Sequence, residues 1–320
     1  MRGRSTCVSA FAATQAFGLA TPLGINSTTG FAGLCLGGGF GWLTRKHGMT
    51  IDNLLSADLI AADGSYRVVS AANDPDLFWA LRGGGGNFGV VTSFEIALHP
   101  VGPLVHAGLV IYPASQVREV LRGWRDFTET APDELSVWAV IRKAPPLPFL
   151  APEVHGTGAR NYWKTSDSDE LDDDAIDVFV DAARSIRGPE CEVFIAQLGG
   201  AMARVPSDAT AYAGRDARYI MNVHGRWRRP EDDGTIRAWA RRMFEETAPF
   251  ATGGAYVNFL TEDESSRVVS AYGSNYERLR EVKERIDPDN LFRMNHNIPP
   301  CGCARVGSSV RARRGAPGAA

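Results

Sequence analysis

Two glycine clusters, at residues 37–41 and 83–89, are the part of this sequence best suited to chemistry. Glycine costs backbone entropy on folding, so such density usually serves positive φ angles or a ligand lying directly against the backbone. Ahead of the first cluster, residues 27–30 (Ser-Thr-Thr-Gly) supply hydroxyl groups and a further glycine. Hydroxyl and backbone N–H groups together hold pyrophosphate. We therefore predict a phosphate-bearing cofactor along this stretch, with an ordinary Ser/Thr turn as the alternative.

The second cluster contains the spacing Gly84-x-Gly86-x-x-Gly89, which matches a dinucleotide-binding fingerprint as a letter pattern. That fingerprint needs a strand before the glycines and a helix after them, because the pyrophosphate meets the helix N-terminus. Here residues 76–82 predict a helix and residues 90–96 predict a strand, so the order is reversed. A Rossmann site is not expected, and loop amides must hold any phosphate.

The elements that position these clusters follow from periodicity. Residues 57–62 and 66–69 predict a hairpin, with Asp63-Gly64 at a type I′ turn. From residue 105 the pattern changes to strands alternating with longer amphipathic helices, which predicts an antiparallel sheet backed by helices on one face, an α+β arrangement. The strands predicted beyond the hairpin unit are residues 105–112, 135–141, 191–198, 217–227 and 253–259, and residues 145–164 are expected to be an irregular connection.

Composition limits the class of protein. The chain has 320 residues, enough for about two domains at about 100–200 residues each, and a net charge of -3. Scattered Lys and Arg give no electrostatic footprint for nucleic acid. No apolar run approaches the roughly 18 residues of a membrane span, and residues 1–17 lack the apolar core of a secretory signal. Five cysteines without C-x-x-C spacing favour a reducing compartment, so we predict a cytoplasmic protein.

Seven acidic residues between Asp167 and Asp177 suggest cation binding at first sight. Their spacing does not match an EF-hand loop, and acids in the first turn of a helix oppose its dipole favourably. We interpret the run as a solvated helix start and predict no metal site. A docking surface for a protein partner is the alternative.

Several motifs, taken in order, resemble the flavin-linked oxidases of the berberine-bridge-enzyme type, within the vanillyl-alcohol-oxidase-like flavoproteins. Residues 27–41, Asp52-Asn53, 78–82 with the following glycines, and 88–95 are similar to the flavin-binding half. Residues 256–259, 275–279 and 287–293 resemble the C-terminal signature. No single match would suffice, but the order of the motifs from about Ala13 to Pro300 is specific in combination.

The resemblance implies an α+β, two-domain PCMH-type FAD-binding fold, incomplete in this chain, with an antiparallel-sheet substrate domain backed by helices. The implied division is an FAD-binding domain at 1–101, a substrate domain at 102–252, a segment at 253–300 that returns to the FAD domain, and a disordered tail at 301–320. Family members carry an Arg-Gly-Gly-Gly-His type loop that no residues here match, so we expect an N-terminally shortened FAD site. A second expected loss lies between Gly156 and Gly158, and it would expose an apolar patch.

The resemblance also implies FAD as the cofactor and a small-molecule substrate and dioxygen as reactants. A C–H bond beside an alcohol or amine would give hydride to the flavin while a tyrosine takes the proton. Tyr256 is the first candidate, Tyr272 the second, and Asn258 would orient the substrate or flavin edge. The residues implied to hold FAD are Ser27, Thr28, Thr29, Gly30, Gly33, Gly37, Gly38, Gly39, Gly41, Asn87, Gly89, Val90, Val91 and Asn297.

Two alternatives stay open at this point. The tyrosines are equally well explained as core residues of a strand and a helix edge, and the chain as a non-catalytic remnant that no longer binds FAD. Cys35 is expected to be a small buried residue rather than a flavin attachment point.

Overall fold

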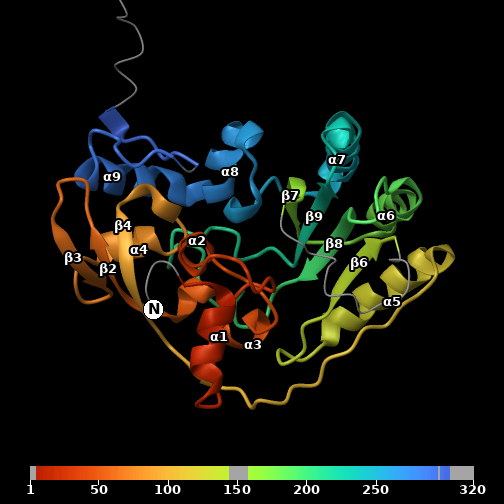
Figure 1. Ribbon diagram of the computed structural model, residues 1–320, viewed down its shortest axis with the longest axis horizontal. Helices are drawn as coiled ribbons and strands as arrows, with labels where there is room; N and C mark the ends of the chain where they lie inside the picture. The colour runs from red at the N-terminus through yellow and green to blue at the C-terminus, as the bar shows by residue number, and fades with distance from the viewer. Residues whose placement is uncertain (1–4, 144–157, 295, 303–320) are drawn as a thin grey trace, which may run out of the picture.

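The computed structural model describes residues 5–143, 158–294 and 296–302 (Figure 1). The first part of the chain contains α1 (Cys7–Gln15), β1 (Leu19–Ala20), α2 (Phe31–Leu36), α3 (Thr44–His47), β2 (Leu54–Ile60), β3 (Tyr66–Ser70), α4 (Pro75–Leu81), β4 (Val90–Ile96) and β5 (His99–Pro100). The second contains α5 (Val117–Thr130), β6 (Trp138–Arg142), β7 (Arg160–Ser168), α6 (Asp173–Ser185), β8 (Glu192–Gln197), β9 (Tyr219–Trp227) and α7 (Asp233–Thr247). The last helices, α8 (Val268–Tyr272) and α9 (Tyr276–Ile286), return to the first part.

The predicted hairpin is confirmed as β2 and β3, and β4 pairs with the other edge of β2 to give the order β3-β2-β4. The predicted type I′ turn is wrong, because that turn needs a positive φ at both central residues. Gly64 has a φ of 79°, whereas Asp63 is not among the described residues with positive φ. Instead, an Asp63 side-chain oxygen accepts a hydrogen bond from the Ser65 N–H at 2.9 Å and closes the loop.

The second glycine cluster lies between a helix and a strand, in the order predicted: α4 precedes it and β4 follows. Gly83 has a φ of 125°, and a Cβ there would lie 2.4 Å from the backbone nitrogen of Tyr212. The Gly83 N–H also donates to the carbonyl of Leu36 at 3.0 Å. This bond joins the second cluster to the helix that leads into the first.

The predicted antiparallel sheet is confirmed, with the strand order β6-β8-β9-β7. Helices α5, α6 and α7 lie on one face of it, as Figure 1 shows, and their apolar residues share a core with the strands. Residues 160–164 are predicted as the end of an irregular connection, but they belong to β7, which pairs with β9 from Arg160↔Trp227 to Ser168↔Tyr219. The α+β interpretation therefore holds, with β7 as a strand of this sheet that the pattern did not predict.

Two predicted strands are wrong. Residues 105–112 form no ladder with a described strand, and the apolar side chains there are exposed, Leu109 at 73% and Val110 at 75%. A β-prone sequence becomes a strand only where a sheet edge accepts its backbone hydrogen bonds. Residues 253–259 turn instead, and Val257–Phe259 is a short 3-10 helix. Residues 145–157 of the expected irregular connection lie outside the described residues, as do the expected loss near residue 156 and residues 303–320 of the expected tail.

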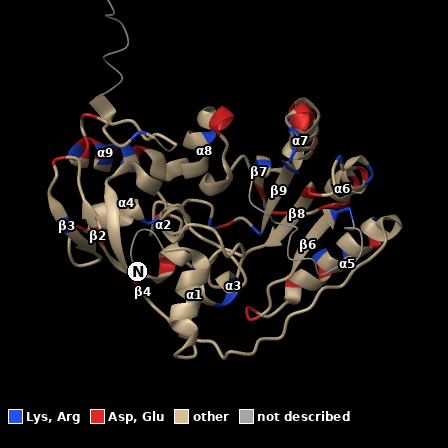
Figure 2. Ribbon diagram, viewed as in Figure 1, with Lys and Arg blue, Asp and Glu red and all other residues tan. Residues whose placement is uncertain are grey.

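The acidic run from Asp167 is not a solvated helix start throughout. Asp167 is buried in β7, and α6 begins only after Asp172, whose side chain accepts from the Ala175 N–H at 2.7 Å. Asp173 and Asp177 form ion pairs with Arg122 and Arg118 of α5. Figure 2 shows both charge signs along α5 and α6. No described helix has the length and apolarity needed to cross a membrane.

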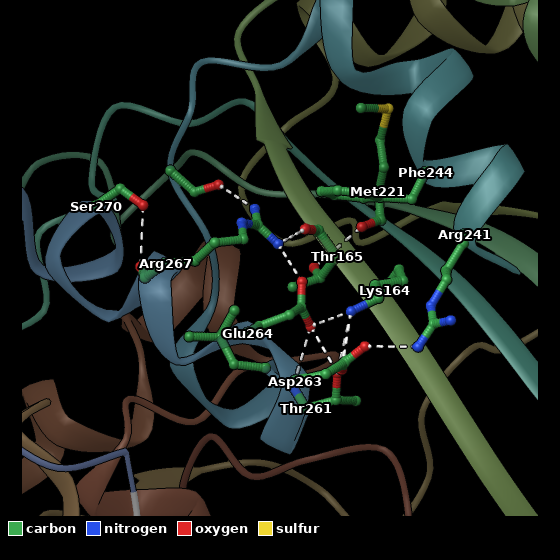
Figure 3. Close-up of polar contacts among 12 residues, drawn as sticks. Lys164, Thr165, Met221, Arg241, Phe244, Thr261, Asp263, Glu264, Arg267 and Ser270 are labelled. Carbon is green, nitrogen blue, oxygen red and sulfur yellow. Dashed lines mark hydrogen bonds and ion pairs between the residues drawn. The ribbon is translucent and has the colours of Figure 1, made fainter. Parts of the chain in front are cut away.

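A buried ion-pair network joins β7 to the C-terminal segment (Figure 3). The Lys164 ammonium lies 3.1 Å from Asp263 and 3.2 Å from Glu264, and both Lys164 and Glu264 are buried. Arg267 approaches Glu264 to 2.7 Å, and Arg241 approaches Asp263 to 3.1 Å. Buried charges are tolerated when several partners satisfy them, so the network fixes the position of residues 261–267 on the sheet.

Lys164→Met should lower the free energy of unfolding by about 3 kcal/mol, because it removes one partner of a buried ion pair. The matched control is Arg184→Met, whose partner Asp181 and own side chain are both exposed, and its effect should stay within about 0.5 kcal/mol. Urea unfolding of both variants measures the difference. Equal losses in the two variants would contradict a structural role for the network.

Candidate active site

The hydroxyl of Tyr256 lies against the first glycine cluster. The Gly39 N–H and the Asn258 side-chain amide each donate to the phenol oxygen, at 2.9 and 2.8 Å. The same Asn258 amide nitrogen donates to the carbonyl of Leu34 in α2 at 3.1 Å. The structure therefore brings together Tyr256, Asn258 and the glycine loop, which are far apart in the sequence.

The glycines of this loop are required by close packing. A Cβ on Gly37 would lie 2.1 Å from the Asn258 side-chain oxygen, and one on Gly39 would lie 2.1 Å from the Thr50 hydroxyl. Gly38 has a φ of 127° and packs against Tyr256. The glycine N–H groups of residues 37–41 already have hydrogen-bond partners within the protein; Gly41, for example, donates to the Thr44 hydroxyl at 2.9 Å. The loop is thus closely packed against the side chains of Thr50, Tyr256 and Asn258.

Burial controls the chemistry of the phenol. Tyr256 is 1% exposed, and burial raises the pKa of its hydroxyl to about 12, while the hydrogen bonds from Asn258 and Gly39 act in the opposite direction. Two N–H donors aimed at one phenol oxygen stabilise its deprotonated form. The arrangement can therefore accept a proton once the hydroxyl has lost its own, in the manner of a general base.

Aromatic side chains surround the phenol. The rings of Phe40 and Phe259 meet the Tyr256 ring edge-on, each with centroids 4.9 Å away. Behind them lies the face of the sheet opposite to its helices, where Trp163 packs on Phe259 at 4.9 Å and on His224 at 4.5 Å. These rings exclude water from the phenol, which strengthens each polar interaction there.

Sequence reasoning missed Asn222, which lies on the same sheet face. Its side chain is fully buried, and neither its amide nitrogen nor its amide oxygen has a hydrogen-bond partner among the described residues. The alternation along β9 places Ile220, Asn222 and His224 on one face, so this pattern was the available signal. A buried amide with both ends free is suited to a polar ligand group.

Tyr272, the second candidate, lies in a different core cluster. Its ring stacks near Tyr276 with centroids 6.5 Å apart, and burial raises the pKa of its hydroxyl. Tyr256 belongs to the cluster between the sheet and the glycine loop instead. The structure does not bring the two tyrosines together.

The remaining residues implied to hold FAD fall into two groups. Ser27, Thr28, Gly30 and Gly33 are exposed, Thr29 is partly exposed, and a Cβ on Gly30 or Gly33 would meet nothing within 4 Å. The second group is Asn87, Gly89, Val90, Val91 and Asn297.

In this second group, the buried Asn87 side chain donates to the carbonyl of His296 at 3.2 Å and accepts from the Ile298 N–H at 3.1 Å. It thereby holds Asn297 beside the second glycine cluster. The side-chain oxygen of Asn297 is buried and has no hydrogen-bond partner in the described part of the chain. Val90 is exposed, whereas Gly89 and Val91 are buried. Cys35 is fully buried, as expected.

Comparison with known proteins decides the family. Residues 255–299 match a family described as "Berberine and berberine like". The FAD-linked oxidoreductase YgaK of Bacillus subtilis is 30% identical over 332 residues, which cover 89% of this chain and 73% of the relative. The chain belongs to the berberine-bridge-enzyme-like FAD-linked oxidoreductases. FAD is therefore its expected cofactor.

Further relatives of this oxidoreductase agree with that assignment. YvdP of Bacillus subtilis, also an FAD-linked oxidoreductase, is 28% identical over 88% of this chain and 74% of its own length. The xylooligosaccharide oxidase of Thermothelomyces thermophilus is 27% identical over 85% of this chain and 68% of its own length. Among solved structures, BBE-like 28 of Arabidopsis thaliana has a TM-score of 0.80 at 22% identity, covering 94% of this chain and 78% of that one. The last likeness confirms the PCMH-type FAD-binding fold.

Gly37→Ala should lower the free energy of unfolding by about 1–3 kcal/mol, because the new methyl group displaces the Asn258 side chain. Gly33→Ala is the matched control: it lies in α2 with open space around it and should gain about 0.5–1 kcal/mol. Thermal unfolding of both variants measures the contrast. The packing account is wrong if both alanines act alike.

Proposed function

We propose that this oxidoreductase removes a hydride from a C–H bond beside an alcohol or amine of a small molecule and that dioxygen then reoxidises the flavin. The observation that carries the proposal is the buried Tyr256 phenol, whose oxygen accepts hydrogen bonds from Gly39 and Asn258. The relative named as a xylooligosaccharide oxidase supports an oxidase with a hydroxyl-bearing substrate.

The residues suit a phosphate-bearing cofactor at the edge of the glycine loop. The hydroxyls of Ser27 and Thr28 are exposed, and Gly30 and Gly33 leave open space beside them. Asn297 adds a buried amide oxygen without a described partner. We propose that these residues hold FAD. When bound, the flavin supplies the two-electron acceptor for the reaction.

The proposed roles of the protein side chains follow from this placement. The substrate O–H or N–H gives its proton to the deprotonated oxygen of Tyr256, while the hydride leaves the neighbouring carbon, so the product is a carbonyl or an imine. Gly39 and Asn258 hold the phenol oxygen in position throughout. We propose that Asn222 orients a polar group of the substrate from the sheet face, because its amide has both hydrogen-bonding ends free within the described residues.

We also propose the domain division 1–101, 102–252 and 253–300. Its support is one apolar core that contains residues of the first and the last of these segments, such as Phe31 and Leu279. A cytoplasmic location is proposed as well. It is supported by the free thiols of Cys7, Cys35, Cys191 and Cys301, which suit a reducing compartment.

Tyr256→Phe should reduce the rate of flavin reduction by about 10²–10⁴-fold, the usual contribution of a general base, and should leave FAD binding intact. Tyr272→Phe is the matched control: it removes a tyrosine hydroxyl from the other core cluster and should change the rate of flavin reduction by less than about threefold. Anaerobic stopped-flow reduction of the FAD-loaded variants by a substrate found in an alcohol and amine screen measures both. Full activity of the Tyr256→Phe variant would overturn the proposed role.

The rate of flavin reduction should rise with pH between about 7 and 10, because the deprotonated fraction of a phenol with a raised pKa grows over that range. Asn258→Asp replaces an N–H donor by a carboxylate, which raises the pKa of Tyr256 further. At a given pH this variant should be slower by about 10–100-fold. A pH-rate profile that is flat, or unchanged in the variant, would contradict a phenol base.

A further inference from the structure

The carboxyl of Asp167, near the end of β7, is a buried titratable group that the proposed reaction does not use. Asp167 is 2% exposed, and one of its carboxyl oxygens is buried without a hydrogen-bond partner in residues 5–143, 158–294 and 296–302. A buried polar atom in this condition is costly, and natural structures keep few of them.

Asp167 holds the segment that leads to Tyr256. Its carbonyl accepts from the Thr252 N–H at 2.9 Å and from the Thr252 hydroxyl at 3.3 Å, and its N–H donates to the Gly254 carbonyl at 3.4 Å. Gly253 has a φ of 88°, which favours glycine, and a Cβ on Gly254 would lie 2.8 Å from the Asp167 carboxyl. The carboxyl thus packs directly against a two-glycine turn, two residues before Tyr256.

Within the described residues, no charged group forms an ion pair with this carboxyl. Arg267 faces it from the C-terminal segment, but its guanidinium donates to the carbonyls of Thr165 and Gly254 and pairs with Glu264 (Figure 3). Exposed Asp169, just after the end of β7, adds a like charge.

The loop opposite contributes a neutral phenol. A Cβ on Gly214 would lie 3.0 Å from the Tyr212 hydroxyl and 3.1 Å from the Asp167 carboxyl, so the two groups converge. The Tyr212 hydroxyl also lacks a described hydrogen-bond partner. Arg215 lies over the Tyr212 ring, but its guanidinium is paired with Asp52 at 2.7 Å. Burial raises the pKa of Asp167 to about 7, although Arg267 opposes the shift.

We propose that Asp167 is a positioning residue for Tyr256: its neutral carboxyl lets the Gly253–Gly254 turn pack on β7, and its ionisation loosens that turn. The inference rests on the proposed role of Tyr256. An ionised carboxyl in this place needs water, and the glycine turn is the neighbour that yields most readily because it has no side chains. Tyr256 is then held less rigidly against Gly39, so above pH 7 the rate of flavin reduction still rises with pH but less steeply than ionisation of the phenol alone would give.

The sign of the pH effect follows from the raised pKa. Below about pH 4, Asp167 is neutral in both the folded and the unfolded chain and adds no pH dependence. Between about pH 4 and 7 the unfolded chain ionises first, so stability falls as pH rises. Above about pH 7 Asp167 is ionised in both the folded and the unfolded chain, so its contribution to the free energy of unfolding no longer changes with pH. The folded chain then has a charged Asp167 and a loosened Gly253–Gly254 turn.

Hydrogen exchange of residues 252–260 at pH 6 and pH 8, measured in the full chain and normalised to the exchange of residues 54–70, tests the proposal. Wild-type protection should fall about tenfold at pH 8, and Asp167→Asn, which has no charge to gain, should show no such fall. Asp169→Asn is the matched control and should keep the wild-type fall.

The proposal is overturned if wild-type protection is the same at both pH values or if Asp167→Asn keeps the fall. The wild-type comparison stands by itself even if the variant fails to fold. Failure of the proposed function is distinguishable from failure of this inference, because an active Tyr256→Phe variant would remove the role of Tyr256 and leave the exchange result in place.

Discussion

The close approach of residues 37–39 to Tyr256 and Asn258 is the constraint on which the rest of the site depends. Only glycine permits it, since a Cβ on Gly37 would fall within 2.1 Å of the Asn258 side chain. The approach lets a backbone N–H reach a phenol 217 residues further along the chain. It also joins the first part of the fold to the C-terminal segment. The aromatic face of the sheet packs against both in one apolar cluster. Loop, phenol and sheet therefore have to fold together.

Local patterns predicted the elements whose stability is local. The hairpin of β2 and β3, the helix-before-strand order around the second glycine cluster and the amphipathic helices all follow from periodicity within a short window. Strand β7 does not follow from periodicity, because Lys164 and Asp167 are polar residues at buried positions of the strand, where the pattern expects apolar ones. Lys164 is acceptable there only because Asp263 and Glu264 come from a segment about a hundred residues away. A sequence window contains no information about such partners.

The candidate site shows the same limit. The density of glycines predicted a backbone in close contact with another group. The order of the motifs predicted the family, and the similarity to YgaK confirms it. The identity of the contacting groups was not predictable. The glycine N–H groups of the loop bond to other groups of the protein, whereas the side chains of Ser27 and Thr28 are exposed. The sequence ranked Tyr256 before Tyr272 as the proton acceptor, but it could not show what surrounds either side chain. Long-range packing separates them, because one lies at the glycine loop and the other in a different core.

The central claim is that this packed loop is one wall of a working FAD site. The most direct measurement is the visible absorption spectrum of the purified full chain after incubation with FAD and removal of unbound flavin. The account predicts a flavin band that stays with the protein, is released by acid precipitation, and bleaches when a suitable alcohol or amine is added without oxygen. A folded, colourless protein with no response to added FAD would contradict it and would favour a non-catalytic remnant of the family.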